Sequence, residues 1–130
     1  MDELLQKKDS LEVIPEKTFS QFKEYSIILN KIGILYRKSN DFQLALKYYN
    51  KVQEISHQIG DDEMNFLSRN NMAVVYLDNI KDYNSAYNIR SNLLTDLEEK
   101  DSLDNFLLKN KLFYLLNSVD ALFNLQRYDE

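Results

Sequence analysis

Two segments of this chain repeat each other at a distance of about forty residues. Each copy holds a small residue, a tyrosine three positions later and an alanine about ten positions further on. The two sets are Gly33, Tyr36 and Ala45, and Ala73, Tyr76 and Ala86. Internal similarity at a period between about 20 and 50 residues is typical of arrays in which one supersecondary unit stacks on the next. The repeat therefore restricts the chain to a repeat architecture before any other feature is considered.

Apolar residues within both copies recur at three- and four-residue intervals, which is the period of one face of an α-helix. The chain has two glycines and one proline, and this leaves little turn chemistry for a β-protein. Thr18 and Gln21 have capping-box spacing, and Gly60 suits the left-handed residue that ends a helix. We therefore expect an all-α fold. The predicted helices lie near residues 2–13, 19–37, 41–59, 62–78 and 83–99, with a last one that ends near 126.

The two copies differ in the length of the turn between their helices. Tyr76 lies seven residues before Tyr83, whereas Tyr36 lies six residues before Phe42. The spacing predicts that the extra residue belongs to a longer turn at residues 78–82.

The first copy resembles a tetratricopeptide repeat, whose first helix carries a large apolar residue, a small residue and a tyrosine at positions 7, 8 and 11. The residues that match are Leu29, Ile32, Gly33 and Tyr36, followed by Ala45 and Tyr49 in the second helix. The chain departs from this family in three ways. Its period is about 40 where the family has 34, no tryptophan is present, and His57 and Arg90 stand where a proline and an aromatic residue are expected.

This resemblance covers about residues 20–130 and implies antiparallel helical hairpins that stack as a right-handed α-solenoid. The expected divisions are 1–17 as an N-terminal helix or remnant of a preceding repeat, 18–60 as repeat 1, 61–100 as repeat 2, and 101–130 as the first helix of a truncated repeat 3. Because the sequence stops where a further helix should begin, we expect a piece of a longer protein. Its open C-terminal end would expose apolar residues, so we also expect self-association as a homodimer through that end.

The resemblance implies a non-catalytic scaffold that binds a protein or a peptide in the concave groove of the hairpins. Repeats of this length are similar to those of bacterial signalling proteins, in which the array precedes a kinase or a DNA-binding domain. The alternative is therefore a regulatory or sensory domain whose output domain lies beyond residue 130.

In the family, positions 2, 5, 9, 12 and 13 of each first helix line this groove. Asn30 and Asn70 both fall on position 5, and an amide can pair with both polar groups of a peptide backbone. Two such amides would form a ladder for an extended peptide, although chance placement among fourteen asparagines is the alternative. The groove residues carried over are Ile27, Asn30, Ile34, Arg37 and Lys38, then Leu67, Asn70, Val74, Leu77 and Asp78, then Phe113, Leu116 and Asp120.

Other functions lack the residues that they need. The family's clamp for a C-terminal carboxylate uses lysine and asparagine where this chain has Asn30 and Ile34. With no cysteine and only His57, thiolate and multi-histidine metal sites are excluded, and the acidic residues 61–63 suit helix capping. A net charge of −5 disfavours direct nucleic-acid binding.

The sequence contains neither a glycine-rich phosphate loop nor a membrane-spanning apolar run, and Lys7 and Lys8 suit a solvated surface. We expect no enzyme activity, no cofactor and no membrane contact in this segment. A cytoplasmic location is favoured, with the periplasm as the alternative for a piece of a larger protein.

Overall fold

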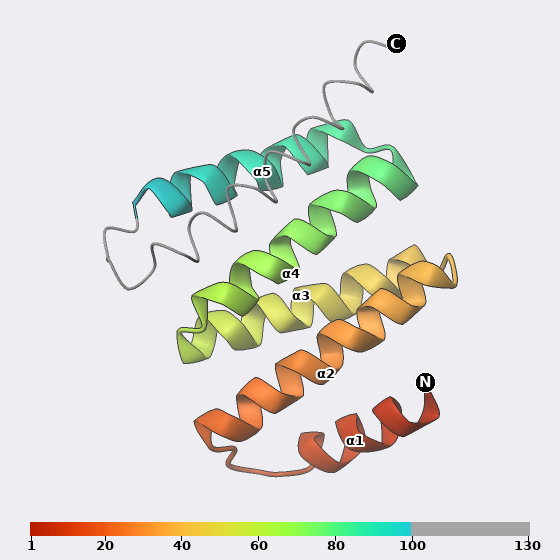
Figure 1. Ribbon diagram of the computed structural model, residues 1–130, viewed down its shortest axis with the longest axis vertical. Helices are drawn as coiled ribbons and strands as arrows, with labels where there is room; N and C mark the ends of the chain where they lie inside the picture. The colour runs from red at the N-terminus through yellow and green to blue at the C-terminus, as the bar shows by residue number, and fades with distance from the viewer. Residues whose placement is uncertain (100–130) are drawn as a thin grey trace. The chain divides into compact units, whose positions relative to one another are not determined.

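A computed structural model describes residues 1–99, and this part of the chain is helical with no strand (Figure 1). The all-α prediction is confirmed for these residues. The expectations for Phe113, Leu116 and Asp120, for the last helix and for the C-terminal interface lie outside the described residues. The elements are α1 (Asp2–Glu12), α2 (Phe19–Lys38), α3 (Phe42–Ile59), α4 (Asp62–Val74), the π-helical segment η1 (Val75–Ile80) and α5 (Tyr83–Glu98).

The chain divides into two compact units, residues 1–68 and 69–130, and each is described by itself. The boundary falls within α4, so the first turns of that helix belong to the first unit and its end belongs to the second.

Local signals place the start of α2, the end of α3 and the start of α4 as predicted. The Gln21 backbone N–H donates to Thr18 Oγ1 at 3.2 Å, and the Thr18 N–H donates to Gln21 Oε1 at 2.9 Å, which completes the capping box of α2. Gly60 ends α3 in the left-handed conformation with φ of 72°. Asp61 Oδ1 accepts the backbone N–H of Met64 at 3.2 Å, so capping accounts for this acidic residue.

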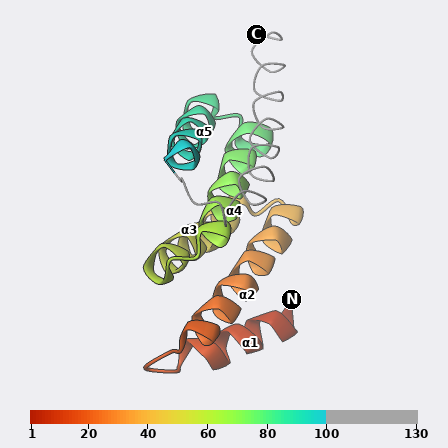
Figure 2. The same cartoon turned by 60° about the vertical axis from the view of Figure 1, so that its left-hand side comes forward.

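In the first unit, α2 and α3 lie side by side and antiparallel, as Figures 1 and 2 both show. Side chains from both helices form its core, and Met64 from the start of α4 joins them. The buried members are Tyr25, Leu29, Val52, Ile55 and Met64, with Leu11, Phe22, Tyr48 and Leu67 packed against them.

Gly33 of α2 and Tyr49 of α3 pack closely against each other. A Cβ atom at Gly33 would lie 2.7 Å from Tyr49 Cε1, and only 1% of Tyr49 is exposed. The small residue of the first repeat is therefore needed because an aromatic ring occupies the space beside it.

The second unit has its own small core where η1 packs against α5. Ala73, Leu77 and Ala86 are buried there. An ion pair also joins α4 to α5, with Arg69 Nη1 at 2.7 Å from Asp96 Oδ2.

The predicted turn at residues 78–82 was wrong in its place, because the helix continues to Ile80. The extra residue is absorbed by π-helical winding of Val75–Ile80, and only Lys81 and Asp82 separate η1 from α5. The Asp82 N–H therefore reaches back six residues, to the Tyr76 carbonyl at 2.8 Å.

Candidate functional site

The predicted groove residues of α2 form an uneven surface in the first unit. Ile27 is 36% exposed, Ile34 and Arg37 are half-buried, and Lys38 is exposed. Ile27 and Ile34 are seven residues apart, which places them on the same face of the helix. This face therefore carries an apolar strip with cations at its C-terminal end.

The predicted groove residues of α4 and η1 are placed less favourably for contact. Leu67 packs against the core of the first unit. In the second unit, Val74 is half-buried and Asp78 is exposed. Leu77 is only 1% exposed and belongs to the core, so it offers no surface to a partner. The π turn changes the direction of the side chains after Val75, and the register carried over from α2 no longer holds at Leu77.

The two asparagines of the predicted ladder are buried. Asn30 is 9% exposed and Asn70 is 7% exposed. Asn70 Oδ1 accepts no hydrogen bond from the residues that the structure describes, whereas Asn30 has a polar partner. A peptide ladder needs accessible amides, so this burial argues against it, and the ladder stays a prediction.

Sequence reasoning missed a cleft of about 390 Å³ in the first unit, which residues of α1, α2 and α3 line. Its volume falls within the range of about 300–1,000 Å³ that small-molecule sites occupy. Tyr25 and Leu29 line it from α2, and these two residues are 5% and 2% exposed. Tyr48 lines it from α3, and its ring stacks on that of Tyr36 with 5.5 Å between the centroids. These three lining side chains give the cleft an apolar and largely aromatic floor.

The hydroxyl group of Tyr25, one of these lining residues, has a fixed protonation state at neutral pH. Tyr25 Oη donates to Glu12 Oε1 at 3.2 Å. Burial raises the pKa of Tyr25 to about 12, and the charge and hydrogen bond of Glu12 act in the same direction. The Tyr25 hydroxyl is therefore a hydrogen-bond donor at neutral pH.

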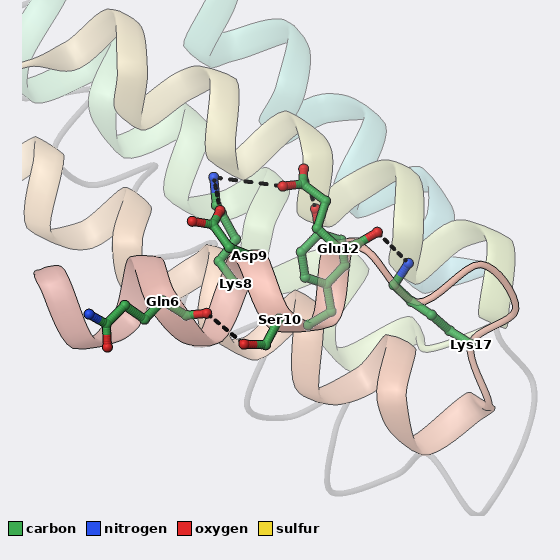
Figure 3. Close-up of polar contacts among 7 residues, drawn as sticks. Gln6, Lys8, Asp9, Ser10, Glu12 and Lys17 are labelled. Atoms are coloured by element: carbon green, nitrogen blue, oxygen red, sulfur yellow. Dashed lines mark hydrogen bonds and ion pairs between the residues drawn. The ribbon is translucent and has the colours of Figure 1, made fainter.

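On the α1 side of the cleft, the charged groups pair with each other. Lys8 Nζ lies 3.3 Å from Asp9 Oδ1 and 3.9 Å from Glu12 Oε2 (Figure 3). Burial lowers the pKa of Lys8, but the hydrogen bond to Asp9 and the nearby charges of Tyr48, Glu12 and Asp9 outweigh this effect. The net result is a raised pKa. Lys8 is therefore a stable cation at this edge.

On the α3 side of the cleft, one of the two lysines has no ion pair with the described residues. Lys51 Nζ lies 3.9 Å from Glu54 Oε2, and Asn50 Nδ2 donates to Glu54 Oε1 at 3.4 Å. Lys47 also lines the cleft, and it forms no ion pair with the residues that the structure describes. Both lining carboxylates thus have partners, and the uncompensated charge of the cleft is positive.

One signal of this cleft was present in the sequence. Lys47, Lys51 and Glu54 follow at intervals of four and three residues, so they share one face of α3. The expectation of a solvated surface at Lys7 and Lys8 holds for only one of them. The Lys7 side chain is 58% exposed, whereas that of Lys8 is 20% exposed.

Comparison of the chain with protein-family models, with curated proteins and with solved structures finds no match. The resemblance to tetratricopeptide repeats stays a prediction. None of the helices within residues 1–99 has the length and apolar composition that a membrane span requires. In the same residues, no three histidine or carboxylate side chains gather as metal ligands would.

Proposed function

We propose that this chain is a non-catalytic scaffold that binds a protein or a peptide on stacked helical hairpins of the tetratricopeptide type. The observation that supports this is that the two hairpins share the same turn and the same helix cap. Each turn has one residue in the left-handed conformation, Asn40 with φ of 63° and Lys81 with φ of 66°. Asp41 and Asp82 then cap the next helix through the N–H of the third residue that follows. Such repeated units build the extended binding surfaces of solenoid proteins.

The contact surface in this proposal begins on α2. Ile27 and Ile34 would bury apolar side chains of the bound segment, as in recognition of an amphipathic helix or an extended peptide. Arg37 and Lys38, in the last turn of α2, would contact acidic groups of the same segment. Leu77 has no part in this surface because it is a core residue.

A selection from a library of displayed random peptides tests this function. We expect enriched peptides with apolar residues near acidic ones. Their affinity should fall at least tenfold in the double variant Ile27→Glu/Ile34→Glu, because two charges would replace apolar contacts. Val13→Glu is the matched control, since Val13 is 77% exposed and lies outside this face. An absence of enriched peptides, or equal binding by the double variant, would overturn the proposal.

The cleft on the first unit favours a second candidate function, that of a regulatory or sensory domain. A sensory domain needs a site for a small signal molecule besides its contact with an output domain. The cleft of about 390 Å³ has the size of such a site.

A further inference from the structure

We propose that the cleft between α1, α2 and α3 binds a small organic monoanion, a carboxylate attached to an aromatic or aliphatic group. This inference goes beyond the scaffold function and does not depend on it. It rests on three properties of the cleft, namely its floor, its charge and its position on α2.

The floor requires a ligand with an apolar part. Tyr25 and Leu29 are buried side chains that line an open cleft, and Tyr48 adds the face of a ring. An aromatic ring or an aliphatic chain of the ligand would cover the half-buried ring of Tyr48 and remove its apolar surface from water. A purely polar ion would leave this floor hydrated and would gain little binding free energy from it.

The charge of the cleft requires an anion. Glu12 is engaged by Lys8 and by the Tyr25 hydroxyl, and Glu54 is engaged by Lys51 and by Asn50. A ligand cation would find both carboxylates occupied and would face three ammonium groups. An anion would find the charge of Lys47 uncompensated and would form a charge-assisted contact with it.

The balance of lining charges indicates a single negative charge on the ligand. Lys8 pairs with Asp9 and Glu12, and Lys51 pairs with Glu54. Lys47 is therefore the lining lysine that has no ion pair with the described residues, and one negative charge matches it. A phosphate monoester carries about two negative charges at neutral pH, whereas a carboxylate carries one. A carboxylate therefore matches a single unpaired lysine better than a phosphate monoester does.

The cleft and the proposed peptide surface use different faces of α2. Tyr25 and Leu29 are four residues apart and share one face, whereas Ile27 and Ile34 share another. Substitutions on one face can therefore be scored without changing the other. Failure of peptide binding and failure of anion binding are separate results.

The test is an NMR titration of the full chain with three probes. Phenylacetate carries both the ring and the carboxylate, phenylacetamide lacks the charge, and acetate lacks the ring. We expect phenylacetate to shift the backbone amide signals of Leu29, Lys47 and Tyr48. Its affinity should exceed that of each other probe by about tenfold, the loss expected for one missing charged or apolar contact.

The variant Lys47→Gln should weaken phenylacetate binding by about tenfold and leave phenylacetamide unchanged. Lys31→Gln is the matched control, because Lys31 is an exposed lysine of α2 that does not line the cleft. Both substitutions are on exposed side chains and should leave the fold intact. Three results would each overturn the proposal: no shifts at about 10 mM phenylacetate, equal affinity for phenylacetamide, or equal losses in the two variants.

Discussion

The two hairpins form the same turn, but the second does so with one more residue. In the first, the Asp41 N–H donates to the Tyr36 carbonyl, five residues back, at 2.9 Å. In the second, the Asp82 N–H donates to the Tyr76 carbonyl, six residues back, at 2.8 Å. The additional residue changes the winding of the helix and does not enlarge the loop. An insertion in a helical repeat can thus be absorbed without loss of the turn that follows it.

The hairpins also differ where their helices meet. The first pairs Gly33 with Tyr49, whose ring fills the space of the absent Cβ. At the equivalent positions the second hairpin has Ala73, which is buried, and Arg90, whose guanidinium lies 5.2 Å from the centroid of the Tyr87 ring. At this position the first hairpin packs a large buried ring against a glycine, whereas the second has an alanine and a half-buried arginine.

Among equivalent substitutions in the two hairpins, Tyr49→Ala should show the largest difference in destabilisation. Removing this buried ring leaves a large cavity, and we expect a loss of about 3–5 kcal/mol in the free energy of unfolding. Arg90→Ala, the equivalent change in the second hairpin, should cost about 1 kcal/mol or less because Arg90 is half-buried. Urea unfolding followed by circular dichroism measures both. Similar losses would break the comparison.

Gly33→Ala should destabilise the chain by about 1–2 kcal/mol, since overpacking outweighs the helix propensity that alanine gains. In the Tyr49→Ala background the same substitution should be neutral or stabilising, because the ring that it meets is gone. The double-mutant cycle measures this coupling. Additive losses would show that Gly33 serves some purpose other than making room for Tyr49.

The helix ends could be predicted because their signals are local. Thr18 with Gln21 and the glycine at position 60 act within one turn of their own helix, so no tertiary information was needed. The π segment could not be predicted in this way. Spacing located the extra residue, but its placement goes together with the burial of Leu77 against α5, which is a tertiary contact.

The cleft depends on packing to an even greater degree. Lys7 and Lys8 are adjacent and chemically identical, yet only Lys8 is turned toward α2 and α3, where Tyr25 and Tyr48 lie. The position of α1 is defined by contacts with residues far along the chain. For the same reason the groove register, carried over by position alone, did not anticipate that Leu77 and the two asparagines are buried.

The N-terminal caps of α3 and α5 provide a smaller and pH-dependent test. Asp41→Ala should cost about 1 kcal/mol. Asp82→Ala should cost more at neutral pH, because Ser85 Oγ also donates to Asp82 Oδ2 at 2.7 Å.

The two hydrogen bonds from Ser85 lower the pKa of Asp82 below its ordinary 3.8. The folded state therefore binds this proton less readily than the unfolded state. The stabilisation is complete above the unfolded pKa and is lost as the pH falls through the lower folded pKa. Urea unfolding between neutral pH and pH 3 should show the Asp82→Ala difference shrinking below pH 4. Ser85→Ala should reduce this pH dependence, and a difference independent of pH would contradict the assignment.

Insertion of one asparagine between Lys38 and Ser39 should have the smallest effect of all, below about 1 kcal/mol. It gives the first hairpin the spacing of the second. The inserted residue would lie among the exposed residues 38–40, so we expect no loss of a buried core contact. In this variant, hydrogen exchange should show that the backbone N–H of Asp41 (wild-type numbering) is still protected by the Tyr36 carbonyl. The reverse change, deletion of Asn79, should cost more, because it alters the winding that buries Leu77. Equal losses in the free energy of unfolding for the insertion and the deletion would show that the π-helical turn follows from the residue spacing alone and does not depend on the burial of Leu77.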